Sequence, residues 1–266
     1  MLDVVYAQLS DPGCVRDHNE DYLGCVPPQD EEQARTHGWL FALADGVGGH
    51  QRGEVASSLA VEKLLAGFRN ALPGEPYTTL LPRLVQAANT QVFEAGLTAG
   101  SSGASMATTV VACALRYDRA IVSHVGDSRC YLVRQQYAVS LTRDHTVSSE
   151  QQRLGLVSAR EAAGTATSHL LSRALGTEMF VSVETSEHQI FPGDTLLLCS
   201  DGLHHSVNSE DIVAVTSKTA SFEQAAATLV ALAKERDGSD NISVQLIGVR
   251  AVERVGMYRG RHYKIQ

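Results

Sequence analysis

The stretch LFALADGVGGH, residues 40–50, ends an apolar run at a single acid, Asp45, and continues with three glycines and a histidine, His50. The apolar residues before Asp45 are typical of a buried strand, here expected over 38–44. Asp-Gly is a common turn dipeptide, so a tight turn is one explanation. The other is a site in which Asp45 holds a ligand that the bare backbone must also approach.

Similar strand-like runs recur along the chain, each short, rich in β-branched residues and bounded by Gly, Asp or Asn. The expected strands are residues 4–9, 38–44, 107–115, 119–126, 130–134, 195–200 and 242–249, with a hairpin near Tyr117–Arg119. Helical periodicity covers 53–70, 78–97, 209–217 and 221–235, and shorter helices are expected at 146–153 and 158–163. Paired helices between groups of strands, without βαβ alternation, favour an α+β layered domain with largely antiparallel sheets.

Composition excludes several classes of protein. The 266 residues carry a net charge of -8, which argues against a nucleic-acid-binding surface because such a surface needs a basic patch. Five scattered cysteines without CxxC spacing indicate reduced thiols and a cytoplasmic location. No apolar run is long enough to span a membrane, so no membrane insertion is expected. We expect one domain over 1–250 and a C-terminal tail over 251–266.

Four aspartates share one pattern, in which each lies at the end of an apolar strand, next to a small residue or at the start of a turn: Asp45, Asp127, Asp201 and Asp240. Each alone is explained by a turn, but neighbouring strand ends would bring them to one edge, where crowded carboxylates are costly without cations. Oxygen ligands select Mg²⁺ or Mn²⁺. Two such ions can activate a water for in-line attack at phosphorus.

A further cluster, RDHNED at 16–21, follows the first strand. Arg16 could bind a phosphate dianion in a bidentate manner through its guanidinium, or it could form a surface salt bridge with Asp17 or Glu20. Other routes to hydrolysis lack support. The chain has no GxSxG elbow and no GxxxxGK[ST] loop, and the Cys113–Arg119 spacing lacks the glycines of a phosphate cradle. The histidines at 124, 145, 188, 204 and 205 show no metal-ligand spacing and are interpreted as core or surface residues.

These motifs, in this order, resemble the metal-dependent Ser/Thr protein phosphatases (the PPM or type 2C family), in its compact bacterial form. The matching segments are Arg16-Asn19-Glu20-Asp21, DGVGGH at 45–50, SMATTVV at 105–111, HVGDSRCYL at 124–132, LTRDHT at 141–146, LSRALG at 171–176, LLLCSDGL at 196–203 and DNIS at 240–243. The resemblance spans residues 16 to 243, nearly the whole chain.

The resemblance implies a four-layer α-β-β-α sandwich, two antiparallel sheets flanked by helices, with a dinuclear metal site at one edge of the sheets. It assigns roles to nine residues. Asp45 would bridge two Mn²⁺ or Mg²⁺ ions, the Gly46 carbonyl would bind one of them, and Asp201 and Asp240 would complete the other. Glu20 and Asp21 would act through bound waters, and Asp127 with Asp201 would bind a third, weaker ion. Arg16 would hold the phosphate, and His50 would protonate the leaving oxygen.

The implied activity is hydrolysis of phosphoserine and phosphothreonine in proteins by a metal-activated water, reversing Ser/Thr kinase signalling. Residues 144–170 would form a flap beside the site. The expected partners are phosphorylated proteins, including a cognate Ser/Thr kinase, and the expected state is a monomer. Two alternatives remain open from the sequence. One is a catalytically silent pseudophosphatase that binds phosphoproteins, and the other is a hydrolase of small phosphate esters.

Overall fold

Alternation of side chains along β3 (Trp39–Asp45) sets the layered architecture. Leu40 and Ala42 pack against helices on one side of the strand, whereas Phe41 and Leu43 pack toward a second sheet on the other side. Since side chains on a strand alternate between two faces, the same parity directs Asp45 into the layer between the sheets. A strand buried on both faces is continuously apolar, as residues 40–44 are.

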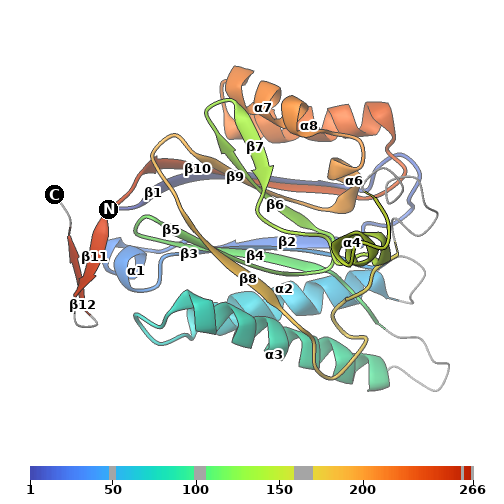
Figure 1. Cartoon of the computed structure of the whole chain (residues 1–266), viewed down its shortest axis with the longest axis horizontal. Coiled ribbons are helices and arrows are strands. Elements are labelled where there is room, and N and C mark those ends of the chain that lie inside the picture. Colours follow the sequence, from blue (N-terminus) through green and yellow to red (C-terminus); the bar gives the residue numbers. More distant parts are fainter. Residues whose placement is uncertain (48–51, 99–105, 159–169, 259–260, 265–266) are drawn as a thin grey trace.

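The computed structural model describes residues 1–47, 52–98, 106–158, 170–258 and 261–264, and Figure 1 shows four layers. The first sheet has the order β2-β3-β4-β5-β8, and the second has the order β1-β10-β9-β6-β7. The strands of the first sheet are β2 (Asp21–Val26), β3, β4 (Val110–Arg116), β5 (Arg119–Val125) and β8 (Glu184–Gln189). Those of the second are β1 (Asp3–Asp11), β10 (Ile242–Ala251), β9 (Thr195–Cys199), β6 (Arg129–Arg134) and β7 (Tyr137–Ser140). All neighbouring strands of both sheets pair antiparallel, so the expected α-β-β-α sandwich is confirmed.

Two pairs of helices cover the outer faces of the sheets (Figure 1). Helices α2 (Gly53–Arg69) and α3 (Tyr77–Thr98) lie on the first sheet, and α7 (Ser209–Lys218) and α8 (Phe222–Arg236) lie on the second. Capping residues define the first turn of two of these helices. Asn208 and Asp211 form a reciprocal capping box at α7, and Ser221 accepts the Gln224 N–H at α8.

Several short elements carry no strong periodic signal and were not expected from the sequence. They are β2, β7, β8, α1 (Glu31–Thr36), α6 (Asp201–His204) and the hairpin of β11 (Val255–Tyr258) with β12 (Arg261–Lys264). Strand β8 reads ETSEHQ and lies at a sheet edge, where pairing with β5 rather than apolar burial defines it. The helix expected at 146–153 is α4 (Val147–Arg153), whereas the one expected at 158–163 lies almost wholly outside the described residues.

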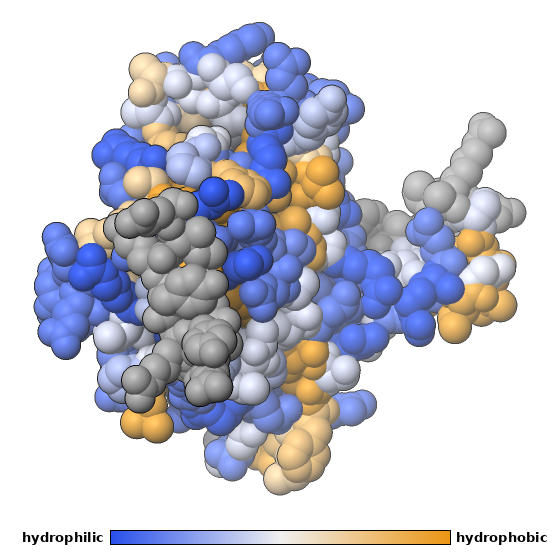
Figure 2. Space-filling view, turned by 60° about the vertical axis from the view of Figure 1, so that its left-hand side comes forward, coloured by the Kyte–Doolittle hydropathy of each residue, from blue (hydrophilic) through white to orange (hydrophobic). Residues whose placement is uncertain are grey.

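The C-terminal hairpin projects from the end of the molecule where both chain termini lie (Figure 1). The domain boundary near 250 and the flap boundaries remain predictions. Within the described residues, no helix is both long enough and apolar enough to cross a membrane. The face in Figure 2 is mainly hydrophilic, and the apolar side chains of its described residues form small separate groups.

The core between the sheets allows a direct test of this packing. Phe41 is fully buried and meets the Tyr6 ring edge-on at 5.2 Å. We expect Phe41→Ala to lower the free energy of unfolding by about 3–5 kcal/mol, since it removes a large side chain from a dry layer. Phe180 is 74% exposed, so Phe180→Ala should change it by less than about 0.5 kcal/mol. Urea denaturation measures both, and equal effects would contradict the assigned packing.

Candidate metal centre

Two carboxylates face each other across neighbouring strands. Asp21 begins β2 and is the direct antiparallel partner of Asp45 at the end of β3, so both side chains enter the layer between the sheets. Directly opposed side chains have Cβ atoms about 4.5–5.5 Å apart, and like charges in such pairs repel. Asp21 is 8% exposed, and neither of its carboxylate oxygens has a hydrogen-bond partner among the described residues.

Burial and the neighbouring charges change the pKa values of both carboxyl groups. Burial, together with the charges of Asp201 and Asp240, raises the pKa of Asp21 to about 7. The hydroxyls of Ser200 and Ser243 oppose this rise only in part. Both hydroxyls also have other partners, since Ser200 donates to the Asn241 carbonyl at 3.4 Å and Ser243 Oγ lies 2.7 Å from Ser10 Oγ. Burial, followed by the charge of Asp21, also raises the pKa of Asp45 well above its usual value.

The second sheet brings two more acids to the same edge. Asp201 follows β9 as the first residue of α6, and Asp240 precedes β10, which pairs with β9. One oxygen of Asp201, Oδ1, is buried without a partner. Burial raises the pKa of Asp201, and the charge of Asp240 adds to the rise. The site is therefore assembled from both sheets.

Asp127 lies in the turn that carries the chain from β5 in the first sheet to β6 in the second. It is 5% exposed. Burial and then the nearby charge of Asp201 raise its pKa to about 8. The charge of Asp201 therefore acts on Asp127, and their shared role at a cation stays a prediction.

The loop before β2 adds Arg16 and Glu20. Arg16 Nη2 lies 2.8 Å from Asp240 Oδ2, so its carboxylate partner is Asp240 rather than Asp17 or Glu20. Asn241 holds this loop: its Oδ1 accepts the Glu20 N–H at 2.8 Å, and its Nδ2 donates to the carbonyls of Pro12 and His18 at 3.0 Å each. Burial raises the pKa of Glu20, whereas the charge of Arg16 lowers it.

Gly46 lies where no side chain fits. A Cβ atom there would lie 2.5 Å from the carbonyl of Gly53 and 2.8 Å from that of Glu20, and the Gly46 N–H donates to the Glu20 carbonyl at 3.1 Å. The absence of a side chain beside Asp45 is therefore required by close backbone contact. His50 lies outside the described residues, as do Gly48 and Gly49.

Two threonines that sequence reasoning left without a role fix the backbone of Asp45. Thr109 Oγ1 accepts the Asp45 N–H at 2.9 Å, and Thr108 Oγ1 donates to the Asp45 carbonyl at 2.8 Å. Thr109 Oγ1 also lies 2.7 Å from Ser128 Oγ, beside Asp127. The signal was present, since polar threonines interrupt an apolar strand in SMATTVV. A similar signal marked Asn241, which follows directly after Asp240.

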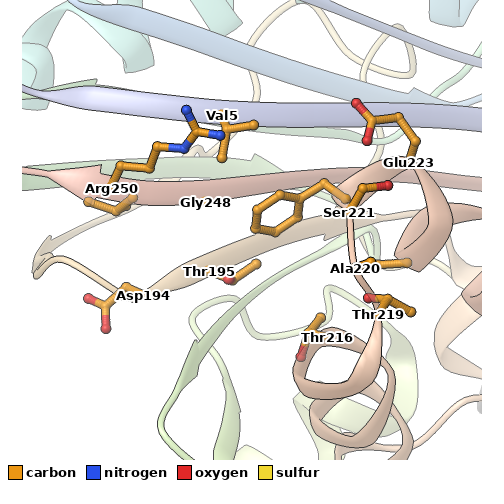
Figure 3. A pocket seen from close by; sticks show the side chains of 14 residues that line it. Val5, Asp194, Thr195, Thr216, Thr219, Ala220, Ser221, Glu223, Gly248 and Arg250 are labelled. Carbon is orange, nitrogen blue, oxygen red and sulfur yellow. The ribbon is translucent and has the colours of Figure 1, made fainter.

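A cavity of about 450 Å³ lies elsewhere, between the second sheet and the start of α8 (Figure 3). Phe222, Thr195 and Arg250 are among its lining residues. Its buried carboxylate, Asp194, is already paired, with Arg134 Nε and Nη2 at 2.8 Å each. The buried carboxylate of this cavity is therefore satisfied, whereas Asp21 and Asp201 at the other edge keep buried oxygens without a partner among the described residues.

The donor set at that edge fits hard divalent cations. Among the described residues it offers carboxylate oxygens without partners, on Asp21 and Asp201, and oxygen ligands are those that Mg²⁺ and Mn²⁺ prefer. Cations there would remove the repulsion that raises the carboxyl pKa values. Together with an arginine at the rim, the arrangement is that of a metal-dependent hydrolase of phosphate esters.

Comparison with known proteins shows which family of phosphate-ester hydrolases the chain belongs to. A sequence model of the family Protein phosphatase 2C matches residues 17–243. The serine/threonine phosphatase stp of Listeria innocua is 34% identical over 256 residues, which cover 95% of this chain and 96% of that protein. The chain therefore belongs to the protein phosphatase 2C family, and it is a serine/threonine protein phosphatase.

Solved structures agree with this assignment. The serine/threonine phosphatase of S. agalactiae superposes with a TM-score of 0.85 at 30% identity, covering 93% of this chain and 100% of that one. The catalytic domain of the phosphatase PstP, crystallised in complex with two manganese ions, gives a TM-score of 0.79 at 32% identity and covers 94% and 100%.

The raised carboxyl pKa values predict an unusual pH dependence for the cation-free protein. A carboxyl whose pKa rises from about 4 in the unfolded chain to about 8 in the fold, as for Asp127, keeps its proton when folded. Stability should then fall as pH rises from 4 to 8. In EDTA at pH 8, we expect Asp127→Asn to raise the free energy of unfolding by about 1 kcal/mol or more.

Denaturant titrations at pH 5 and pH 8 measure this effect. The gain from Asp127→Asn should shrink at pH 5, where the native carboxyl is protonated. An equal gain at both pH values would contradict the electrostatic origin of the effect.

Proposed function

We propose that this phosphatase hydrolyses phosphoserine and phosphothreonine in proteins with two Mn²⁺ or Mg²⁺ ions held at the Asp21–Asp45 edge. The observation that carries the proposal is the directly opposed Asp21–Asp45 pair, in which Asp21 is buried with both oxygens unpartnered. The proposed ligands are Asp45, the Gly46 carbonyl, Asp201 and Asp240, with Glu20 and Asp21 acting through waters and Asp127 with Asp201 holding a third ion.

When bound, the cations supply positive charge for the phosphate oxygens and lower the pKa of a water that serves as nucleophile. The side chains of this site are proposed to bind the phosphate and to fix the backbone around the ligands. Arg16, anchored at the rim by Asp240, presents a planar guanidinium suited to two phosphate oxygens. The threonines around Asp45 and the amide of Asn241 fix the backbone, so that little reorganisation is needed during the reaction.

His50 is the proposed general acid. An alkoxide leaving from serine or threonine is strongly basic, so proton transfer from an imidazole lowers the barrier. Its position next to the glycines after Asp45 supports the role, since it follows the proposed ligands directly in sequence.

Phosphoproteins are the proposed substrates, and a Ser/Thr kinase that makes them, or is itself phosphorylated, is the proposed counterpart. We propose a monomer that acts in the cytoplasm, which the scattered, odd number of cysteines supports. A small phosphate ester would meet the same carboxylates and Arg16, so comparing substrates is part of the tests below.

The metal requirement is tested with Asp45→Ala. Phosphopeptide hydrolysis should need Mn²⁺ or Mg²⁺, stop with EDTA, and fall more than about 100-fold in the variant, beyond the usual cost of losing an indirect metal contact. Asp3→Ala, an exposed acid at the start of β1, is the matched control and should keep wild-type rates. Turnover in EDTA, or an active Asp45→Ala protein, would refute the proposed centre.

The role of His50 is tested by the leaving group. We expect His50→Ala to slow phosphopeptide hydrolysis by about 100-fold or more, within the usual range for general acid catalysis. An aryl phosphate should be affected far less, since a phenolate leaves without a proton. Steady-state kcat on both substrates measures the difference. Equal losses would remove His50 from the role of acid.

A further inference from the structure

Two histidines without a role so far contact the same turn, Gly126–Asp127. His145 is fully buried and His204 is 9% exposed. They come from different parts of the chain. His145 precedes α4, and His204 ends α6, the helix that begins with Asp201. The turn between them carries Asp127, one of the proposed ligands.

His145 holds the turn from one side through two bonds to Gly126. The backbone N–H of His145 donates to the Gly126 carbonyl at 3.0 Å, and ring nitrogen Nδ1 of His145 accepts the Gly126 N–H at 3.2 Å. A backbone N–H can only donate, so Nδ1 carries no proton and the ring is neutral. The ring stacks on His124 with centroids 4.6 Å apart, and its Nε2 lies 3.3 Å from Glu184 Oε2.

His204 holds the turn from the other side through the opposite ring nitrogen. Its Nε2 lies 2.9 Å from the carbonyl oxygen of Asp127. A carbonyl can only accept, so Nε2 carries the proton of this ring. Through this bond, the backbone of Asp127 is tied to the helix that positions Asp201.

The turn needs such support. Gly126 has φ of 104°, and a Cβ atom there would lie 2.6 Å from Thr109 Cγ2, so the backbone adopts a conformation open only to glycine in a confined space. Asp127 is also repelled by Asp201. A fixed backbone limits the positions that the Asp127 carboxylate can take beside Asp201.

A metal site at His145 is a competing explanation. Ligand atoms of His124, His145 and Glu184 lie within 4.8 Å of one another. Two guanidiniums occupy the surroundings, however. Arg143 Nη2 lies 3.0 Å from Glu184 Oε2, and Arg173 Nη1 lies 3.3 Å from His145 Nε2. With Nδ1 of His145 accepting from Gly126, Nε2 bears the remaining proton of the ring. Positive charge and a protonated nitrogen both disfavour a cation, and a structural role fits better.

We propose that His145 and His204 are positioning residues that hold the Gly126–Asp127 turn through opposite ring nitrogens and thereby keep the Asp127 carboxylate directed at Asp201 for the weakest-bound cation. The inference rests on the proposed function only in taking Asp127 and Asp201 as ligands. It assigns an acceptor at Nδ1 of His145 and a donor at Nε2 of His204.

Reciprocal amide substitutions test this assignment. Asparagine places its amide oxygen near the position of a histidine Nδ1, and glutamine places its amide nitrogen near that of Nε2. We therefore expect His145→Asn and His204→Gln to keep the Mn²⁺ affinity of the weakest site. His145→Gln and His204→Asn should lower it about tenfold, as losing a partner that orients a ligand does.

The readout is the signal of free Mn²⁺ in electron paramagnetic resonance during titration, which does not depend on turnover. Asp127→Asn provides the benchmark for losing the weakest site. His188→Asn is the matched control, because His188 lies on β8, bonds Ser186 at 2.8 Å and should leave the titration unchanged. Thermal melts in EDTA establish that each variant folds. If a variant of one histidine does not fold, the asparagine and glutamine variants of the other histidine still give a complete comparison.

Three results would overturn the inference. Asparagine and glutamine could give equal affinities at both positions, all four variants could bind Mn²⁺ like the wild type, or Asp127→Asn could leave the titration unchanged. Failure of the proposed function has a different signature, namely a wild-type protein that folds and binds Mn²⁺ but does not hydrolyse phosphopeptides in its presence. The two failures are therefore distinguishable.

Discussion

Repulsion between two carboxylates that face each other across adjacent strands is the constraint on which the rest of this structure depends. Asp21 and Asp45 are register partners, and the alternation that buries Phe41 and Leu43 also directs Asp45 into the layer between the sheets. No rotation of a strand relieves the repulsion without exposing apolar residues. The fold therefore holds its acids in place by the same pattern that makes its core, and protons or cations bound at this edge would relieve the repulsion.

Each sheet contributes two acids to this edge, and the connection between the sheets adds a fifth. Asp21 and Asp45 belong to the first sheet, and Asp201 and Asp240 flank strands of the second. Asp127 lies in the turn that passes from one sheet to the other. The layer between the sheets becomes polar near this edge, where Thr109, Ser200 and Ser243 replace the apolar residues found further along. Thr109 and Ser200 accept backbone N–H groups, Ser243 bonds the Ser10 hydroxyl, and both oxygens of Asp21 stay without a hydrogen-bond partner among the described residues.

Sequence patterns anticipated the layered fold, the four long helices and most central strands, because each has a period that burial imposes. They missed β8 and α6 for physical reasons. Strand β8 is a polar edge strand defined by its partner, and α6 spans only Asp201–His204, too short for any periodicity. At the site, the sequence identified the individual acids at the strand ends. It did not show that Asp21 and Asp45 are direct partners across neighbouring strands, because strand register is not determined locally in the sequence. The contacts of His145 and His204 with one turn were hidden for the same reason.

The ion pair at the rim has a consequence for the order of events at the site. Both oxygens of Asp240 are engaged: Oδ2 bonds Arg16 at 2.8 Å, and Oδ1 accepts the Asn241 N–H at 2.9 Å. If Asp240 Oδ2 serves as a ligand in the proposed centre, the cation would compete with the guanidinium for that oxygen. Arg16 would then be free to pair with a phosphate dianion instead. On the proposed function, one aspartate would therefore couple cation binding to phosphate recognition, because the bound cation would release Arg16 before the substrate binds.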